Sequence, residues 1–289
     1  MPEDLIDSAL SRVIELALIE DSGMGDLTSE AIVPEEAETE AKILLKEDAV
    51  VAGLKVAELV FMMCDPAVRV SHQVADGTPG SRGSIVSIIA GQVRGILRGE
   101  RVALNLLQRM SGIATMTAAF VQAVKGTAAR ITDTRKTAPG LRVFDKWAVR
   151  LGGGVNHRFG LDDMVLIKDN HIAAAGGIEP AIRACRDYLG RKHLTIRIEI
   201  ETRSLEEVKQ AIAVGGVDRI MLDNMPVAVV QEAVRMINRS FEVEASGGIT
   251  LDNVRAYAES GVDLISVGAI THSPRSIDLS LDIVSQTAA

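Results

Sequence analysis

Basic residues and glycines gather in one stretch of this 289-residue chain, between residues 132 and 172. Charged residues follow short apolar runs there, and the triplet Gly152-Gly153-Gly154 lies among them. The basic and imidazole side chains of interest are Arg135, Lys136, His157, Arg158 and Lys168. Arginine offers a planar fork of donors to a carboxylate, whereas lysine offers a point charge to a phosphate. The stretch therefore predicts a site for a ligand with several negative charges, such as carboxylates or a diphosphate.

The charge of the whole chain makes this cluster more informative. The formal net charge is −8, yet the segment from 130 to 171 holds eight basic and five acidic residues. An acidic chain argues against general nucleic-acid binding, which needs a basic face. Hydrophobic residues make up 47% of the chain and aromatic residues only 3%, so we expect an aliphatic core. Such a core is typical of α/β packing.

Short apolar runs alternate with helical patterns through the second half of the chain, and these elements must position the cluster. Strands are expected at 129–132, 164–167, 195–200, 219–222, 241–244 and 264–267. Helices are expected at 141–151, 178–190, 204–214, 226–239, 251–260 and 274–285. Repeated β-α units predict a parallel sheet with right-handed crossovers. The number of units and the residues at their ends favour a barrel over an open sheet.

The first hundred residues show a mixed pattern without a repeat. Helices are expected at 4–19 and 53–63, and strands at 38–51, 68–74 and 84–90, which predicts an α+β domain. A long helical pattern starts near Leu97, is interrupted at Ser111-Gly112 and ends at Gly126. We therefore place the domain border near 110, with an N-terminal domain at 1–110 and a barrel at 111–272.

Every expected barrel strand ends in polar, charged or glycine residues. In a parallel barrel, functional groups cluster at the carboxyl ends of the strands. In chain order the ends carry Asp133-Thr134-Arg135-Lys136, Lys168-Asp169-Asn170-His171, Glu199 and Glu201, Asp223-Asn224, Ser246-Gly247-Gly248, and Gly268. A barrel that served only as a scaffold would need no such set, so these ends predict a functional site.

Two of these strand ends have residues that can bind phosphate, and two have acids that can bind a positively charged group or sugar hydroxyls. Ser246-Gly247-Gly248 before a helix can present backbone N–H groups to an anion, although alone it can also be a tight turn. Gly268 closes the following strand, where barrels often hold phosphate. Glu201 and Asp223 end neighbouring strands and suit sugar hydroxyls, a metal-held diphosphate or a developing cation; alternatively they only neutralise the lysines.

Several other residues favour a structural interpretation. Glu199 lies lower on its strand than Glu201, so a structural role is favoured for it. We expect Arg142, Lys146 and Arg150 on a solvated helix face, and His72 and His193 at the surface. The glycines and acids of the stretch at 20–29 predict a turn. A calcium loop is a poor alternative there, because the acid spacing and the terminal bidentate Glu of such a loop are missing.

The sequence also sets expectations about compartment and cysteine chemistry. Cys64 and Cys185 do not form a CxxC pair, so neither a metal knuckle nor a disulfide framework is expected. The acidic start Met1-Pro2-Glu3-Asp4 does not resemble a signal peptide. No apolar run reaches about 18 residues, so no membrane span is expected. A cytoplasmic setting is the default expectation.

Taken together, the motifs resemble the quinolinate phosphoribosyltransferase family over essentially the whole chain. The matching motifs are Glu20-Asp21, Gly25-Asp26-Leu27-Thr28, the segments 98–105 and 110–115, Thr132-Asp133-Thr134-Arg135-Lys136-Thr137, Asn156-His157-Arg158, Leu166-Ile167-Lys168-Asp169-Asn170-His171, the segment 221–225, Ser246-Gly247-Gly248-Ile249, Gly268, and Thr271-His272-Ser273. Such a set, in order and at these spacings, is highly specific, and no position with an assigned role departs from it.

The resemblance implies a fold, a reaction and an assembly. The fold would be an N-terminal α/β sandwich domain and an incomplete α/β (TIM-like) barrel of parallel strands, with 273–289 packing back on the first domain. The reaction would join quinolinate to phosphoribosyl pyrophosphate with Mg²⁺, releasing nicotinate mononucleotide, pyrophosphate and CO₂ in NAD biosynthesis. The protein would form a dimer or a higher assembly in which Arg101 reaches the neighbour's site.

The resemblance also implies a role for each site residue. Quinolinate would be held by Arg101, Arg135, His157 and Arg158. Phosphoribosyl pyrophosphate would be held by Lys136, Lys168, Glu201, Asp223, Ser246, Gly247, Gly248 and Gly268. Of these, Lys136, Lys168, Glu201 and Asp223 would be catalytic. Mg²⁺ would be bound by Glu201 and Asp223, directly or through water.

Three alternatives remain open on the sequence. A related protein of molybdate-transport operons shares the fold but acts on another substrate, and it tends to depart from the segment 168–171 seen here. A second enzyme class would use Lys168 to form a Schiff base, which borohydride would trap. A sensor would bind the phosphorylated sugar without turnover.

Overall fold

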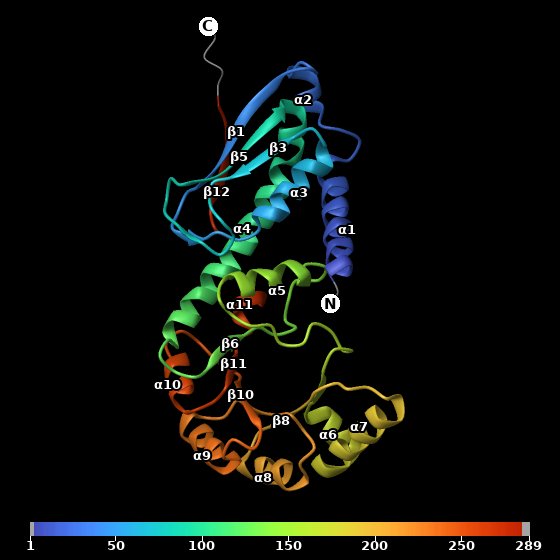
Figure 1. The fold of residues 1–289 in the computed structure, drawn as a ribbon, viewed down its shortest axis with the longest axis vertical. Coiled ribbons are helices and arrows are strands. Elements are labelled where there is room, and N and C mark those ends of the chain that lie inside the picture. The colour runs from blue at the N-terminus through green and yellow to red at the C-terminus, as the bar shows by residue number, and fades with distance from the viewer. Residues whose placement is uncertain (1–2, 285–289) are drawn as a thin grey trace. The chain divides into compact units, whose positions relative to one another are not determined.

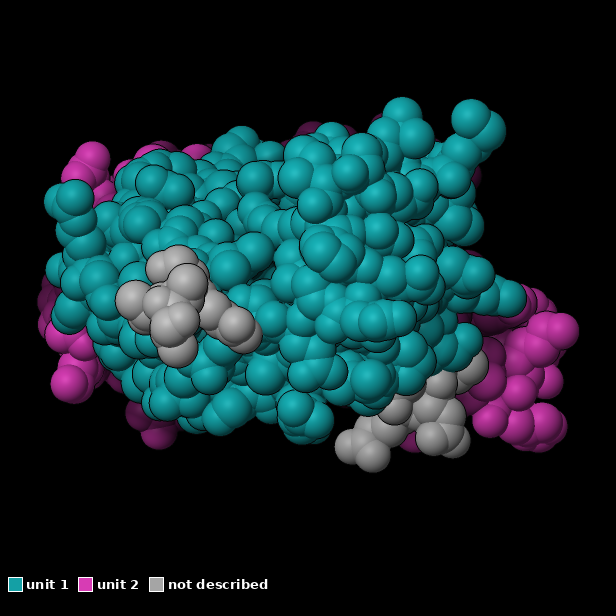
Figure 2. Space-filling view, turned by 90° about the horizontal axis from the view of Figure 1, so that it is seen from above, with its two compact units in different colours: residues 1–118, 137–153, 270–289 teal, residues 119–136, 154–269 magenta. Residues whose placement is uncertain are grey.

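The computed structural model describes residues 3–284, with the side chains of residues 3–7 left out of the description. The predictions for Met1-Pro2 and for 285–289 therefore lie outside the described residues. The chain divides into two compact units, coloured separately in Figure 2. Unit 1 comprises 1–118, 137–153 and 270–289, and unit 2 comprises 119–136 and 154–269.

Unit 1 is built on an antiparallel sheet of four strands in the order β12-β1-β5-β3 (Figure 1). Its strands are β1 (Glu38–Leu45), β3 (Arg69–His72), β5 (Ile85–Gln92) and β12 (Leu279–Ile283). A short ribbon joins β2 (Ala49–Val50) to β4 (Pro79–Gly80). The helices of this unit include α1 (Glu3–Ser22), α2 (Leu27–Ile32), α3 (Leu54–Cys64) and α5 (Arg142–Leu151). The buried positions of β1 alternate with half-buried ones, the pattern of a sheet with one face packed more closely than the other.

The C-terminal strand corrects one prediction. A helix was expected at 274–285, but β12 pairs antiparallel with β1, with Leu281 opposite Ile43. Ile277 and Leu279 are buried while Asp278 is exposed, so the segment follows the period of a strand. The free edge of β1 supplies the backbone partners that the sequence pattern alone did not reveal.

The long helix corrects a second prediction. Helix α4 runs from Val93 to Ala123 without the interruption expected at Ser111-Gly112. The Ser111 hydroxyl accepts the N–H of Ala52 at 3.0 Å, and a Cβ on Gly112 would lie 2.0 Å from the carbonyl oxygen of Arg275. These two small residues let other backbone segments approach the helix closely, so they mark a contact and not a break.

A third correction concerns the helix after the first basic pair. Lys146 on α5 is buried, not solvated, and so is its neighbour Asp145, which accepts two hydrogen bonds from Arg109 at 2.8 Å. Arg150 at the end of the helix is exposed, as expected. A bidentate partner makes burial of a charged group tolerable, and sequence spacing does not show such partners.

Unit 2 confirms the expected parallel sheet. Its six strands lie in the order β6-β11-β10-β9-β8-β7 and all pairs are parallel. They are β6 (Arg130–Thr132), β7 (Val165–Ile167), β8 (Ile198–Thr202), β9 (Arg219–Asp223), β10 (Glu242–Ser246) and β11 (Leu264–Ser266). The helices are α6 (Asp169–Ala175), α7 (Ile178–Lys192), α8 (Leu205–Val214), α9 (Val227–Ile237) and α10 (Val254–Glu259), and α11 (Ala269–His272) follows β11.

The curved sheet is an incomplete barrel. Its two end strands are β6 and β7, which are not paired with each other in the described residues. The segment after Gly154 lies beside β6, where Val155 forms a bridge with Thr132 and donates its N–H to the carbonyl of Ile131 at 2.9 Å. This segment leads directly to His157 and Arg158, and Asp133 after β6 accepts the backbone N–H of His157 at 2.8 Å.

Candidate functional site

Alternate residues of three neighbouring strands build the site. Glu199 of β8 is paired in register with Arg219 of β9, which is paired with Glu242 of β10. Two residues further along each strand come Glu201, Met221 and Glu244, and then Asp223 pairs with Ser246. Because side chains two residues apart share one face of a strand, these polar groups all lie on one face of the sheet. Charged side chains therefore continue from the carboxyl ends of these three strands into the interior, along one face of the sheet.

The predicted acids and one predicted lysine come together at the carboxyl ends of the strands. The Lys168 Nζ atom lies 3.8 Å from Oε2 of Glu201. Glu201 and Asp223 are also close enough that the charge of Asp223 raises the pKa of Glu201, after burial, which raises it most. The positive charges of Lys168 and Arg203 act in the opposite direction. Two carboxylates that repel each other form a place where a cation is favoured.

Arg203 is the cation that the sequence reasoning missed. Its guanidinium contacts Asp169 at 2.9 Å and Glu201 at 3.2 Å, and its Nε lies 3.9 Å from Asp223. The residue directly follows β8, as the other polar residues follow their strands. Reading one residue past the end of β8 would have found it.

The donor set at these strand ends fits magnesium. Mg²⁺ prefers oxygen ligands and commonly binds one or two carboxylates together with substrate phosphates. Glu201 and Asp223 supply such carboxylates on neighbouring strands. These two residues could hold the metal, with Lys168 and Arg203 beside it.

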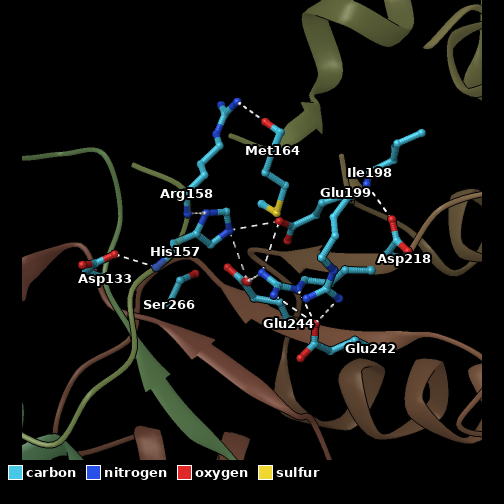
Figure 3. Close-up of polar contacts among 12 residues, drawn as sticks. Asp133, His157, Arg158, Met164, Ile198, Glu199, Asp218, Glu242, Glu244 and Ser266 are labelled. Carbon is cyan, nitrogen blue, oxygen red and sulfur yellow. Dashed lines mark hydrogen bonds and ion pairs between the residues drawn. The ribbon is translucent and has the colours of Figure 1, made fainter. Parts of the chain in front are cut away.

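A second cluster lies deeper, around the imidazole of His157 (Figure 3). Its Nε2 atom lies 3.0 Å from Oε2 of Glu199 and 3.4 Å from Oε2 of Glu244. The side chains of both glutamates are fully buried, and that of His157 is 6% exposed. Burial opposes the charge of His157, but hydrogen bonds and charge from Glu199 and Glu244 raise its pKa to about 9. Glu199, for which the sequence favoured a structural role, therefore contacts His157, a predicted site residue.

This deeper cluster has the donor types of a metal site, but a side chain already supplies the cation. His157, Glu199 and Glu244 offer ligand atoms within 4.8 Å of one another. The Nη1 atom of Arg219 lies 2.8 Å from Glu244 and 3.4 Å from Glu199. A guanidinium that faces both carboxylates neutralises the charge that a metal ion would otherwise balance.

Arg158 lies next to His157 and close to a second arginine. The Nη1 atom of Arg158 donates to the carbonyl of Met164 at 3.2 Å. Burial lowers the pKa of Arg158 most, and the positive charge of Arg135 lowers it further. Two guanidinium groups that repel each other are stabilised when an anion binds between them, so this pair is suited to a carboxylate.

The predicted phosphate loop follows β10. Gly247 has a φ of 93°, and a Cβ there would lie 2.2 Å from Oδ1 of Asn224, so only glycine fits. The N–H of Asn224 donates to the carbonyl of Ser246 at 2.8 Å, and the Asn253 amide donates to the carbonyl of Gly248 at 2.9 Å. These contacts hold the loop in shape. The following helix α10 begins only at Val254, so its dipole does not start directly at the glycines as expected.

The remaining predicted residues are placed as follows. Arg135 and Lys136 follow β6, where the N–H of Lys136 donates to the Thr134 hydroxyl at 3.0 Å. Gly268 follows β11. Arg101 belongs to unit 1, on α4, and its side chain is 57% exposed, with Glu100 3.7 Å away.

Several structural expectations can also be assessed. His193 is exposed. His72 is half-buried and contacts Ser87 at 2.9 Å and Glu58 at 3.3 Å. Both cysteines are free thiols. Within the described residues 3–284, none of the helices is long and apolar enough to cross a membrane.

Comparisons with known proteins show the family of the chain. Residues 26–111 match the N-terminal domain of quinolinate phosphoribosyl transferase, and residues 113–282 match its C-terminal domain. The chain is 47% identical to the chloroplastic nicotinate-nucleotide pyrophosphorylase [carboxylating] of Arabidopsis thaliana, over 96% of this chain and 84% of that protein. It is 42% identical to the probable enzyme of that name from Bacillus subtilis, over 95% and 93%.

A solved structure is similar over nearly the whole chain. The nicotinate-nucleotide pyrophosphorylase from Francisella tularensis superposes with a TM-score of 0.91 at 36% identity, covering 98% of both chains. The family profiles together span more than half of the chain, and the relatives exceed 40% identity over nearly all of it. The chain therefore belongs to the quinolinate phosphoribosyltransferase family.

Proposed function

We propose that this protein transfers the phosphoribosyl group of phosphoribosyl pyrophosphate to quinolinate, with decarboxylation, in NAD biosynthesis. The products are nicotinate mononucleotide, pyrophosphate and CO₂. The observation that carries the proposal is the pair of charge environments in unit 2. Arg135 and Arg158 repel each other, and a bound dicarboxylate would neutralise their positive charges. Glu201 and Asp223 lie at strand ends, with Lys168 beside Glu201.

The arginines select the acceptor. Quinolinate has two carboxylates next to a ring nitrogen, and arginine binds a carboxylate through two parallel hydrogen bonds. Arg135 and Arg158 supply two such forks within one chain. Arg101, on the exposed surface of α4, supplies a third from a neighbouring copy, in a dimer or a higher assembly. A donor contributed in this way would make the assembly necessary for full quinolinate affinity.

The strand ends bind the donor substrate. Lys136 and Lys168 take phosphate oxygens, and Glu201 and Asp223 take the ribose hydroxyls through or beside Mg²⁺. When bound, Mg²⁺ neutralises the diphosphate and makes it a better leaving group. The rigid loop Ser246-Gly247-Gly248, with Gly268, holds the 5′-phosphate through its backbone N–H groups. These contacts bring the sugar carbon and the ring nitrogen together, which supplies much of the rate through effective molarity.

The reaction depends on stabilising the charges that develop on the sugar, the diphosphate and the ring. When the bond between the sugar carbon and the diphosphate breaks, positive charge develops on the sugar, and the carboxylates of Glu201 and Asp223 stabilise it. The lysines stabilise the departing diphosphate in the same step. The ring nitrogen then bonds to the sugar carbon and becomes positively charged. The adjacent carboxylate leaves as CO₂, and the electron pair that it leaves on the ring carbon is stabilised by that nitrogen until the carbon is protonated.

The alternatives are less well supported. The relatives found do not favour a molybdate-operon type of protein, since those at high coverage carry the quinolinate enzyme's names. A Schiff base at Lys168 would have to form beside the carboxylate of Glu201. The cytoplasmic location stays a prediction, because plant relatives are named chloroplastic or mitochondrial.

A substrate comparison tests the proposal. The protein is mixed with phosphoribosyl pyrophosphate and Mg²⁺, and with either quinolinate or nicotinate, which has a single carboxylate. We expect quinolinate to be consumed and nicotinate to react at least about a hundredfold more slowly, because one bidentate pair is lost and its arginine is left unpaired. Equal rates, or borohydride trapping of a carbonyl compound on Lys168, would reject the proposed reaction.

A further inference from the structure

Two fully buried glutamates lie deeper in unit 2 than the proposed substrate site. Glu199 and Glu244 come from β8 and β10 and lie on either side of β9. Burying two carboxylates is costly, and aliphatic residues normally fill the interior of a parallel barrel. The proposed reaction does not use these two groups directly. Their presence therefore needs another explanation.

Both carboxylates are directed at one imidazole, as Figure 3 shows. His157 Nε2 contacts Glu199 at 3.0 Å and Glu244 at 3.4 Å. Its other ring nitrogen, Nδ1, accepts the backbone N–H of Arg158 at 2.8 Å. In the neutral ring that accepts this bond, Nε2 carries the proton, so the contacts with the carboxylates and with Arg158 coexist. In the charged ring Nε2 keeps its contacts with the carboxylates, and Nδ1 becomes a donor.

The rest of the segment is held at a different strand. Asp133, which follows β6, accepts the backbone N–H of His157 at 2.8 Å and the side-chain amide of Asn156 at 2.7 Å. Val155 extends the edge of β6. The segment 155–158 is therefore anchored to β6 at its start and to the interior glutamates at His157, and Arg158 is the next residue.

We propose that Glu199 and Glu244 are positioning residues that act through the imidazole of His157 to hold Arg158 at the carboxylate-binding position. The inference rests on the proposed function, since it names what the two carboxylates do for quinolinate binding. His157 uses its ring nitrogens within the protein and acts through Arg158. Arg219 completes the arrangement by contacting both carboxylates from β9, and the hydroxyl of Ser266 is hydrogen-bonded to Glu244.

Glu242 provides a matched control. It is a glutamate on the same strand as Glu244, and it contacts the same Arg219, at 2.9 Å. It also contacts Arg197 at 2.6 Å and Arg130 at 3.1 Å, whereas the carboxylates that face Nε2 of His157 are those of Glu199 and Glu244. Substituting Glu242 disturbs the shared arginine without removing an acceptor from the imidazole. It therefore separates a general loss of packing from a specific loss of positioning.

The test compares KM values for the two substrates in the full-length protein. The variants are Glu199→Leu, Glu244→Leu, His157→Leu and the control Glu242→Leu, with Glu199→Gln and Glu244→Gln as shape-preserving versions that keep an acceptor. We expect the first three to raise the KM for quinolinate by about tenfold or more, as when a charge-assisted hydrogen bond is lost. The KM for phosphoribosyl pyrophosphate should change by less than about twofold, and the glutamine variants should recover part of the quinolinate affinity.

Quinolinate binding, measured in the absence of turnover, tests the same inference independently of the KM values. Quinolinate binding by calorimetry should weaken in the same order, and the imidazole nitrogen signals of His157 should shift in Glu199→Gln but not in Glu242→Gln. If a leucine variant does not fold, the glutamine variant carries the test, with an expected rise of about threefold in the KM for quinolinate because the charge of the acceptor is lost.

The outcomes separate the two claims. If His157→Leu weakens quinolinate binding while the Glu199 and Glu244 variants do not, the imidazole touches substrate itself and the inference is wrong. Equal changes in both KM values, or equal effects of Glu242→Leu, would likewise overturn it. Wild-type protein that shows neither quinolinate binding nor turnover would overturn the proposed function. Wild-type turnover with unaffected variants would overturn the positioning role alone.

Discussion

The guanidinium of Arg203 lies 3.2 Å from the carboxylate of Glu201. The same arginine reaches Asp169 and Asp223, so one side chain balances three acids at the strand ends. Glu201 and Asp223 are the proposed magnesium ligands. Arg203 and a bound cation would therefore compete for the same negative charge, and Arg203 would have to yield part of its contact when the metal and diphosphate bind.

This competition predicts the effect of removing Arg203. In Arg203→Gln, Glu201 and Asp223 lose a neighbouring positive charge, so Mn²⁺, used as a probe for Mg²⁺, should bind severalfold more tightly. The measurement is the free Mn²⁺ concentration by electron paramagnetic resonance. Arg183→Gln is the control, because Arg183 is an arginine of α7 that pairs with Glu179 of the same helix at 2.6 Å. Unchanged or weaker Mn²⁺ binding in Arg203→Gln would contradict the competition.

The lysines should matter for turnover more than for folding. Lys136→Ala and Lys168→Ala should each reduce kcat by on the order of a hundredfold or more, like the loss of one charge-stabilising donor in other enzymes. The control is Lys209→Ala on α8, because this lysine lies 3.9 Å from Glu206 of the same helix. Steady-state kinetics and thermal unfolding are measured together. Near-normal kinetics in either site variant would reject its assigned role.

Arg158 should determine the affinity for quinolinate. Arg158→Lys keeps the charge but loses the planar fork, so the KM for quinolinate should rise by about tenfold, and Arg158→Leu should raise it further. The KM for phosphoribosyl pyrophosphate should stay nearly constant in both. Arg235→Leu changes an exposed arginine on α9 and should alter neither value. If the two KM values rise together, Arg158 does not act on the dicarboxylate alone.

The arginines around Glu242 predict a pH dependence of stability. Burial raises the pKa of Glu242, but the hydrogen bond from Arg197 and the charge of Arg219 outweigh it, and the net shift is downward. A carboxylate with a lowered folded pKa adds stability above its unfolded value, near 4.5, and this stability is lost as the pH falls through the lower folded value. Glu242→Gln should therefore destabilise the protein at pH 7 by about 1–2 kcal/mol and have a smaller effect near pH 3.

Urea unfolding at the two pH values tests this prediction. The control is Glu206→Gln, an exposed glutamate of α8 with one partner at 3.9 Å. Its free energy of unfolding should match that of the wild type at both pH values within about 0.5 kcal/mol. If the Glu242→Gln difference is the same at pH 3 as at pH 7, then the charge of Glu242 is not the source of its contribution.

The parallel sheet of unit 2 was predictable because each of its strands can be recognised from the residues of one short segment. Each strand has aliphatic residues within a short segment and is followed by polar residues or glycine, so the six strands and the residues at their ends were found, with shifts of a few residues such as that of β8. Helix α6 was missed because it is short and follows β7 directly. Arg203 was missed because the reading of β8 stopped at Glu201. The family resemblance added the residue roles, which spacing alone left open.

The wrong predictions depended on partners far away in the sequence. The segment at 279–283 is a strand because β1 offers it an edge, and Lys146 is buried although its spacing suggested a solvated face. The cluster of Glu199, Glu244 and Arg219 around His157 joins four separate segments of unit 2. No pattern within one segment reveals such a contact. Side-chain partners of this kind need a structure.

The most direct test of the central claim measures both carbon products at once. Quinolinate labelled in the carboxylate next to the ring nitrogen is mixed with phosphoribosyl pyrophosphate, Mg²⁺ and the protein, and labelled CO₂ and nicotinate mononucleotide are followed together. The proposed function predicts that they appear in equal amounts, and that neither appears without Mg²⁺. Consumption of phosphoribosyl pyrophosphate without CO₂, or the absence of both products, would contradict it.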